Sequence, residues 1–401
     1  MDAAQLLTEL LSPAGRDDPY PRYAQLHELG AATAVPGVVV VVGYDAINGV
    51  LRDPAFGAAD AELYDQIMPG WRDHPSVSLN GLLTLNPPEH GRIRRLVSRE
   101  FTSRRIAALA PAIAAMTDSL LAEMAERGAA GRPVEFMHDF AFLLPVTAIC
   151  ELIGIPEADR ETFRPLATAL VATLEPAITP DQLAAADEAA VQLNDYFTDL
   201  AERRREQPRD DLLSALVGVH DADDGRLSSA ELLDNLALLL VAGFETTANL
   251  LGNGLRIILQ DPSIGDELRT GSIPVPAFVE EVLRFDSPVQ LTSRRRADPT
   301  EIAGVTATPE DEVLLLLGGG NRDPRRFCRP DTFDPARADA GPLSFGGGAH
   351  FCLGAALARL EAGVAFPRLL ARFPELAPAG APTRKDTIVL RGYETLPVTV
   401  Q

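Results

Sequence analysis

The chain has little lysine, little cysteine and little positive charge. Lys385 is its only lysine, and 36 basic residues stand against 57 acidic ones in 401, a formal net charge of -21. Such an acidic chain repels phosphate backbones, so we expect no nucleic-acid partner. The three cysteines are Cys150, Cys328 and Cys352. They are too few, and odd in number, for a disulfide framework, and this low count favours a reducing cytoplasm.

Long hydrophobic runs are also absent. The first twenty residues have no basic start followed by an apolar run, so we expect no signal peptide. The longest apolar stretches, residues 236–244 and 313–317, are far shorter than the ~18 residues of a membrane span. The sequence therefore predicts a cytoplasmic protein without a membrane anchor.

The hydrophobic patterning predicts a mainly α protein with small β-sheets. Residues 38–42, followed by Gly43, form a buried strand pattern, and short apolar runs alternate with turns over 288–317. Most of residues 87–260 has a helical pattern. Within it, Ser228 and Glu231 have capping-box spacing, and no breaker follows before Asp261 and Pro262, so this helix would be about 50 Å long. Because no repeat or linker interrupts the chain, we expect one domain over residues 1–401.

The most informative segment, residues 345–354, reads FGGGAHFCLG. Its glycines allow the backbone to approach a sulfur or a flat ligand closely. Cys352 precedes a helical run at 355–361, and a helix N-terminus favours the thiolate form of a cysteine. Backbone N–H groups there can donate to the sulfur and tune a bound metal. On haem iron, a thiolate ligand favours cleavage of the O–O bond.

Several other sites fit this segment less well. A phosphate-binding loop needs a Lys and a Ser or Thr after the glycines, and a dinucleotide fingerprint needs a glycine where Phe351 stands. A zinc site needs more ligands than His350 and Cys352. A cysteine nucleophile beside His350 and a buried structural cysteine both stay open.

The segment resembles the haem-binding signature of the cytochromes P450, Phe-x-x-Gly-x-x-x-Cys-x-Gly. Phe345, Gly348, Cys352 and Gly354 fill every fixed position of that pattern. The resemblance extends from about residue 17 to the C-terminus and points to the soluble bacterial members. It implies haem b with Cys352 as the axial ligand of the iron, and a fold in which a long central helix crosses the molecule over the haem.

The long helix contains a second informative segment, Ala-Gly-Phe-Glu-Thr-Thr at 242–247. An acid and a hydroxyl inside an apolar helix are costly unless they are satisfied. Thr246 can hydrogen-bond to the carbonyl of residue 242 and open the helix, and Gly243 leaves room for a small ligand. A bent helix with a satisfied threonine and an ion-paired glutamate is the alternative. By the family resemblance, Glu245 and Thr246 deliver protons to dioxygen.

Three charged residues match motifs that support the cysteine segment. Glu281 and Arg284 share a helix face at i,i+3, and Arg337 lies in a later segment, Phe-Asp-Pro-Ala-Arg at 333–337. By themselves such charges are common on exposed helices. The resemblance implies that the three residues lock the segment that carries the cysteine.

Four basic residues match the family's haem-propionate contacts. His90 and Arg94 share one helix face at i,i+4, His350 lies two residues before the cysteine, and Arg294 follows a strand pattern. Two more arginines follow Arg294 directly, so a shift of one or two positions stays open. Each of these residues can also be an ordinary solvated basic side chain.

The resemblance implies a monomeric monooxygenase that uses dioxygen and two electrons to oxidise a mostly hydrophobic small molecule, free or tethered to a carrier protein. The electrons would come from NAD(P)H through a ferredoxin and its reductase. Hydroxylation is the default outcome, with epoxidation or oxidative coupling as variants, in natural-product tailoring or in catabolism of a terpene or aromatic. We expect a basic docking face at Arg92, Arg95, Arg99 and Arg359, and a substrate pocket lined by Val241, Ala242, Phe244, Val289 and Leu291.

Three alternatives remain: a peroxide-driven enzyme of the same fold, a catalytically silent recruitment protein, and a cysteine-dependent hydrolase.

Overall fold

The computed structural model describes residues 1–58, 70–77, 81–176, 178–222, 227–338 and 341–400. The chain divides into two compact units that interleave along the sequence. Met1–Gly57, Ala110–Leu144 and Thr246–Gln401 form the first unit, and Ala58–Leu109 and Pro145–Glu245 form the second. The expectation of one domain over residues 1–401 stays a prediction.

Helices dominate both units, as expected. Those of the first unit are α1 (Ala3–Leu10), α2 (Pro13–Asp17), α3 (Tyr20–Leu29), α4 (Tyr44–Arg52), α8 (Ala110–Arg127), α14 (Pro262–Thr270), α15 (Val275–Phe285), α16 (Leu317–Gly320) and α17 (Ala355–Arg372). Those of the second unit are α6 (Glu89–Ser98), α7 (Ser103–Ala108), α10 (Phe163–Val171), α11 (Pro180–Glu206) and α12 (Leu212–Asp221), while α9 (Leu143–Ile153) and α13 (Ser229–Gln260) contribute residues to both. Short 3-10 helices are η1 (Trp71–Asp73), η2 (Ala129–Gly131), η4 (Glu157–Thr162), η5 (Ala172–Leu174), η6 (Leu343–Phe345) and η7 (Gly348–His350), and η3 (Met137–Ala141) is a short π-helix.

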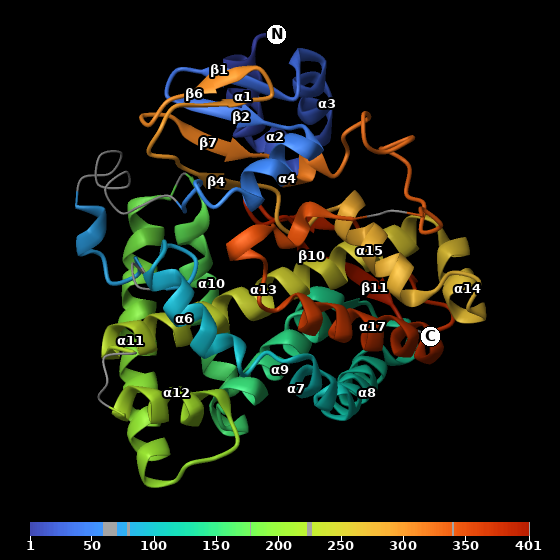
Figure 1. Cartoon of the computed structure of the whole chain (residues 1–401). Helices are drawn as coiled ribbons and strands as arrows, with labels where there is room; N and C mark the ends of the chain where they lie inside the picture. Colours follow the sequence, from blue (N-terminus) through green and yellow to red (C-terminus); the bar gives the residue numbers. More distant parts are fainter. Residues whose placement is uncertain (59–69, 78–80, 177, 223–226, 339–340, 401) are drawn as a thin grey trace. The chain divides into compact units, whose positions relative to one another are not determined.

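Among the described residues, four small sheets lie in the first unit. The strands are β1 (Ala32–Val35), β2 (Val38–Val41), β3 (Val134–Glu135), β4 (Thr292–Arg294), β5 (Thr300–Ile302), β6 (Val305–Ala307), β7 (Glu312–Leu315), β8 (Ala377–Pro378), β9 (Thr383–Arg384), β10 (Tyr393–Thr395) and β11 (Pro397–Thr399). The strand patterns at 38–42 and over 288–317 predicted β2 and β4 to β7. The largest sheet has the order β1-β2-β7-β4, with β2 and β7 parallel and its other pairs antiparallel (Figure 1). The other sheets are β3-β11-β8, β5-β6 and β9-β10.

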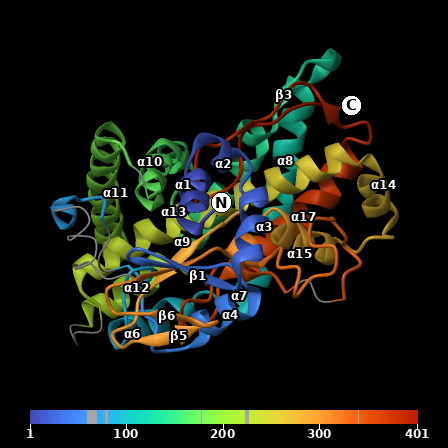
Figure 2. The ribbon, with the colours of Figure 1, turned by 90° about the horizontal axis from the view of Figure 1, so that it is seen from above.

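Strand β2 is the centre of the first unit's core. Successive residues of a strand point to opposite faces, so its valines reach two separate clusters. Val39 and Val41 pack with Ile47 and neighbours from α4, whereas Val40 packs with Leu6 and other residues of α1 and α3. Figure 2 shows α1, α2 and α3 grouped beside β1 at the N-terminus. Burial of both faces explains why the strand consists of consecutive valines rather than alternating apolar and polar residues.

The second unit is built around α11, which packs against α10 and α12 (Figure 1). Its N-terminus has a capping box, in which Thr179 and Gln182 each accept from the other's backbone N–H. On α11, Asp187 accepts hydrogen bonds from the backbone and hydroxyl of Ser76 and lies 2.7 Å from His74 Nδ1. These bonds fasten residues 74–76 to the helix.

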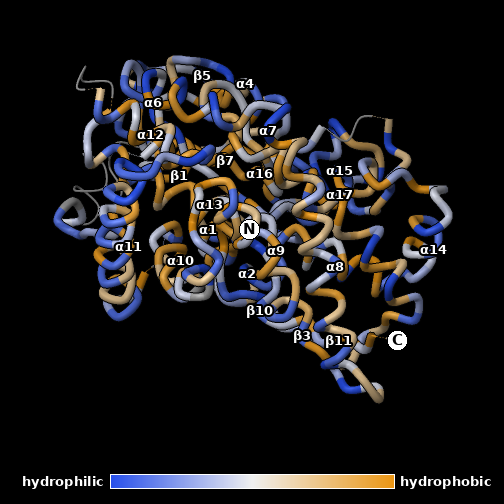
Figure 3. Tube along the Cα trace, turned by 90° about the horizontal axis from the view of Figure 1, so that it is seen from below, coloured by the Kyte–Doolittle hydropathy of each residue, from blue (hydrophilic) through white to orange (hydrophobic). Residues whose placement is uncertain are grey.

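The long helix α13 has 32 residues and begins and ends where the sequence predicts. The backbone N–H of Ser228 donates to Glu231 at 2.8 Å, and Glu231 N–H donates to Ser228 Oγ at 3.2 Å, which confirms the capping box. By length and composition α13 could cross a membrane, and α6 to α8 would count as a second span if taken as one bent pair. However, 72% of the tested stretch of α13 is buried inside the protein, as in a core helix, and Figure 3 shows the hydropathy of the chain along its course. The count of uninterrupted apolar residues did not identify this helix as a possible membrane span, because asparagines, a glutamate and threonines are spaced along it.

Candidate functional site

The cysteine segment is a tight loop between η6 and α17 in the first unit. Gly346 and Gly348 have φ values of 66° and 63°, in the left-handed region that favours glycine. At Gly348 a Cβ would lie 2.1 Å from the carbonyl oxygen of Leu51, so no larger residue fits. The N–H of Cys352 donates to Phe345 O at 2.9 Å and closes the loop. The loop presents Cys352 as an exposed residue just before the helix.

Buried hydroxyl groups tie the start of this loop to α15. Ser344 Oγ donates to Leu283 O at 2.6 Å and lies 2.7 Å from Ser287 Oγ. Asn321 accepts from the N–H of Leu343 at 2.7 Å and donates to Ser344 Oγ at 3.1 Å. The sequence analysis missed Ser287 and Ser344, because partners 57 residues apart leave no periodic signal.

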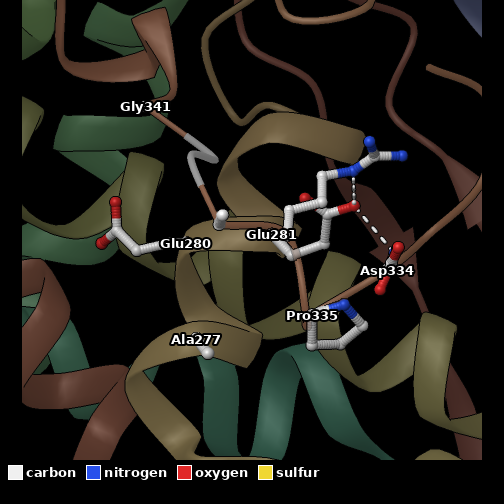
Figure 4. Close-up of a pocket in the computed structure, with 8 residues that line it drawn as sticks. Ala277, Glu280, Glu281, Asp334, Pro335 and Gly341 are labelled. Atoms are coloured by element: carbon white, nitrogen blue, oxygen red, sulfur yellow. Dashed lines mark hydrogen bonds and ion pairs between the residues drawn. The ribbon is translucent and has the colours of Figure 1, made fainter. Parts of the chain in front are cut away.

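Glu281, Arg284 and Arg337 come together, as the family motif implies. Arg284 donates to both carboxylate oxygens of Glu281, at 2.8 and 2.7 Å, and Arg337 Nε donates to the same carboxylate at 3.1 Å. Asp334 N–H donates to it at 2.8 Å, and Glu281 and Asp334 face each other in Figure 4. Glu281 and Arg284 are 1% and 0% exposed, so their charges are fully paired in the interior. A cavity of about 330 Å³ beside them lies between α15 and residues 334–338 and Gly341.

Arg284 also holds the chain that follows α16. Its guanidinium donates to the carbonyl oxygens of Asn321 and Pro330, both at 2.9 Å, and of Thr332 at 3.1 Å. Arg337 donates to carbonyls in the same stretch, Cys328 O at 2.6 Å and Arg329 O at 2.7 Å. The network therefore fixes backbone that has no helix or strand of its own.

The three consecutive arginines that begin at the last residue of β4 have three different environments. Arg296 pairs with Asp53 at 2.9 Å, and Arg295 donates to Pro309 O at 3.1 Å. Arg294 is only 8% exposed and donates to Ser293 O at 2.7 Å. Among the residues that the structure describes, it has no carboxylate partner. Burial lowers the pKa of its guanidinium. A buried cation without a counter-charge is costly, so this position suits an incoming carboxylate.

Helix α6, in the second unit, carries two further propionate candidates. His90 is 3% exposed and Arg94 is half-buried one turn later. Arg92 pairs with both carboxylate oxygens of Glu231 on α13. In contrast, Arg95 and Arg99 are exposed, and within the described parts of the chain neither has an ion-pair partner. Arg92 is therefore not available as a docking charge.

In the first unit, Arg359 is occupied as well. It donates to both carboxylate oxygens of Glu280, at 2.5 and 3.0 Å, and lies 4.4 Å from the ring centre of Phe345. The arginine therefore covers the aromatic residue that begins the cysteine loop. The expectation that Arg359 is a docking charge is corrected, because its guanidinium is already paired and stacked.

The middle of α13 combines exposed and buried residues. Ala242 is exposed and Thr246 is half-buried, whereas Glu245 is 3% and Phe244 0% exposed. Gly243 does not leave the room for a small ligand that the sequence predicted, because a Cβ at this position would lie 2.8 Å from the side chain of Ile149. The glycine therefore makes room for α9 against α13, and not for a ligand.

The remaining pocket candidates differ in burial. Val241 is 8% exposed, and Phe244 is enclosed completely by protein atoms, as a core side chain is. Val289 forms a bridge with Leu390 and packs against the cluster around β2, while Leu291 packs on the other cluster. Ala242 is the most open of the five.

Comparison with known proteins identifies the family. The family model for Cytochrome P450 matches residues 36–271 and 275–392. The chain belongs to the cytochrome P450 family. It is 39% identical to cytochrome P450 monooxygenase PikC of Streptomyces venezuelae, over 97% of this chain and 93% of that one. It is 36% identical to 6-deoxyerythronolide B hydroxylase of Saccharopolyspora erythraea, over 97% and 98%.

The solved structures agree with this assignment. A crystal structure of P450BioI in complex with an acyl carrier protein that carries hexadec-9Z-enoic acid has a TM-score of 0.88 and 33% identity. The match covers 98% of this chain and 99% of that one. The predicted cytochrome P450 fold, the recognised family and the monooxygenase class are therefore confirmed.

The described residues fit the haem that membership of this P450 family implies. Cys352 offers an exposed sulfur at the edge of a glycine-rich loop. Arg294 offers a buried guanidinium that lacks a carboxylate among the described residues. A thiolate can coordinate haem iron, and a guanidinium can donate hydrogen bonds to a haem propionate.

Proposed function

We propose that this P450 is a haem-thiolate monooxygenase in which Cys352 is the axial ligand of haem b. The observation that carries the proposal is the conformation of the loop of Cys352. Two glycines in the left-handed region and the hydrogen bond from Cys352 N–H to Phe345 O hold this exposed cysteine in place. Haem bound in this way activates dioxygen, so that one oxygen atom enters the substrate. Phe345, Gly348 and Gly354 belong to the same haem-binding segment.

The basic candidates would bind the haem propionates. Arg294 has the strongest support, because it is a buried guanidinium without a carboxylate among the residues described. His90, Arg94 and His350 share this proposed role. The charged network would support the cysteine loop indirectly, because it holds residues 328–334 in place. Its members are Glu281, Arg284 and Arg337.

Glu245 and Thr246 would supply protons for oxygen activation. Both lie in the middle of α13, where Thr246 is half-buried and Glu245 is almost fully buried. A carboxyl that can exchange its proton and a hydroxyl that can pass it on are the groups that proton delivery requires.

The substrate is proposed to be a mostly hydrophobic small molecule in a bacterial natural-product tailoring step. The name of one relative, 6-deoxyerythronolide B hydroxylase, supports hydroxylation in biosynthesis. The structure of P450BioI with a loaded acyl carrier protein supports a carrier-tethered substrate as one form. Ala242, Val241, Val289 and Leu291 remain the proposed pocket residues, and the enzyme is proposed to act in the cytoplasm.

A spectroscopic titration tests the substrate assignment. The purified ferric protein is titrated with polyketide, terpenoid, cyclic-peptide and aromatic compounds, each free and as an acyl-carrier-protein conjugate, while the Soret band is followed. A low-spin to high-spin shift with one class identifies the substrate chemistry, because the bound molecule displaces water from the iron. If only catabolic aromatics or terpenes shift the band, the biosynthetic role is wrong.

Two cysteine variants test the haem ligand. Cys328 is a matched control, because it is exposed, reduced and in the same unit as Cys352. Cys352→Ala should lose the thiolate-type spectrum and oxygenase turnover, whereas Cys328→Ala should keep both. Turnover that survives Cys352→Ala would refute the assignment.

Electrons are proposed to come from NAD(P)H through a ferredoxin that docks at Arg95 and Arg99. This chain is acidic overall, so exposed arginines without nearby ion-pair partners would be favourable points of attachment for an acidic partner protein. Arg95→Glu with Arg99→Glu should slow reduction by an acidic ferredoxin about tenfold or more at low salt. Arg372→Glu, at the exposed end of α17, is the control. Equal reduction rates in all three proteins would contradict the docking site.

A further inference from the structure

Two buried asparagines continue the face of α13 that carries Thr246. Residues 242, 246, 249 and 253 are spaced at i, i+4, i+7 and i+11, so Ala242, Thr246, Asn249 and Asn253 form one stripe along the helix. Asn249 and Asn253 are both 0% exposed. They have the same side chain on the same helix and differ only in their partners.

Asn253 is fully satisfied. Its Nδ2 donates to Asp286 O at 2.9 Å and to Arg391 O at 3.1 Å, and its Oδ1 accepts from Arg384 at 3.1 Å. The amide therefore joins α13 to the end of α15 and to the C-terminal segment. Its role is structural.

Asn249 has the opposite environment. Among the described residues, neither its Nδ2 nor its Oδ1 has a hydrogen-bond partner. The backbone of Gly392 closes one side, since a Cβ there would lie 2.0 Å from Asn249 Oδ1. A buried amide without partners costs about 1–3 kcal/mol for each unmade bond, so a leucine of similar size would be the better core residue. Buried polar groups of this kind are commonly satisfied by internal water.

We infer that Asn249 holds an ordered water molecule beside Thr246 and is a positioning residue for proton delivery. Side chains one helical turn apart have Cβ atoms about 5–6 Å apart. Their polar side-chain ends are therefore close enough for one bridging water, which makes hydrogen bonds of about 2.8 Å. The water accepts from Asn249 Nδ2 and donates to the hydroxyl oxygen of Thr246. The water thereby holds the hydroxyl of Thr246 in one orientation for proton delivery.

The inference rests on the proposed role of Thr246, but its first test does not need turnover. A high-resolution crystal structure should show a water within about 3.2 Å of an amide atom of Asn249. Thermal unfolding should separate two variants. Asn249→Leu should leave the melting temperature nearly unchanged, because it removes the amide together with its water and takes no hydrogen bond from another described residue. Asn253→Leu should lower the melting temperature by several degrees, because it leaves Arg384 and two carbonyls unpaired.

Coupling of the holoenzyme tests the positioning role. Asn249→Leu should divert electrons to hydrogen peroxide and lower the product formed per NAD(P)H several-fold. Asn249→Ser, which keeps a group that can hold water, should restore most of the coupling. Asn253→Leu should stay coupled in the fraction that remains folded.

Several outcomes overturn the inference: no water at Asn249, a loss of stability in Asn249→Leu as large as that in Asn253→Leu, or unchanged coupling in Asn249→Leu. If Thr246→Ala is itself fully coupled, the proposed proton role of Thr246 fails, although the water at Asn249 is still found.

Discussion

Glu361 should make the stability of this P450 fall as the pH rises. The residue lies on α17 and is 0% exposed, and within the described structure neither carboxylate oxygen has a hydrogen-bond partner. Burial raises the pKa of Glu361 well above its usual value. In the unfolded chain the same carboxyl ionises near pH ~4.3. Folding therefore takes up one proton between these two pKa values, and stability is lost as the pH rises through that window.

The magnitude follows from linkage. One proton corresponds to about 1.4 kcal/mol per pH unit. An unfolding entropy of about 2.1 cal/mol/K per residue gives about 0.8 kcal/mol/K for 401 residues. The melting temperature of the wild type should therefore fall relative to Glu361→Gln by roughly 2 °C per pH unit above pH 5.

Differential scanning fluorimetry of both proteins from pH 5 to pH 8 measures this difference. The same substitution at the exposed Glu375 controls for general effects of removing a carboxylate. A difference between wild type and Glu361→Gln that stays constant over this range would refute the reasoning. The carboxyl would then titrate alike in the folded and unfolded chains.

Three further predictions concern buried charge and the proposed proton path. Thr246→Ala should release reducing equivalents as hydrogen peroxide, measured as peroxide formed per NAD(P)H, and tight coupling would contradict its role. Asp286→Asn should cost about 3–5 kcal/mol of stability in denaturant unfolding, because Arg384 and Arg391 each donate to that buried carboxylate at 2.8 Å. Those arginines hold the pKa of Asp286 far below its usual value. The stability that the ionised carboxylate gives the wild type should therefore be lost as the pH falls below about 4, and the variant should not show this loss. Arg284→Lys should lower the melting temperature and haem content, because an ammonium cannot reproduce the bidentate bond to Glu281; unchanged haem content would show that the network does not support the loop.

Local chemistry made much of the fold predictable from the sequence. The capping box at Ser228 and the stop at Asp261 set the ends of α13, since both act through backbone groups within one turn. Four consecutive valines specified β2 as a strand buried on both faces. The spacing from Phe345 to Gly354 specified the cysteine loop. Gly346 and Gly348 adopt left-handed φ values, and Gly348 has no room for a Cβ.

The environment of each polar side chain depends instead on distant segments. Gly243 makes room for Ile149, and Arg92 and Arg359 are occupied by Glu231 and Glu280. No local pattern predicts these partners.

The sequence by itself determined the family, the glycine-rich loop of Cys352 that we propose as the haem-ligand segment, and the order of the main elements, because these depend on local motifs and short-range backbone geometry. Only the tertiary structure decided that Arg294, and not its two neighbours, is the buried cation without a carboxylate among the described residues. It also separated Asn253, which is bonded to chain more than a hundred residues away, from Asn249 one turn earlier. A side chain's partners are set by what long-range packing brings beside it, and burial then determines the energetic cost of the hydrogen bonds that it does not make.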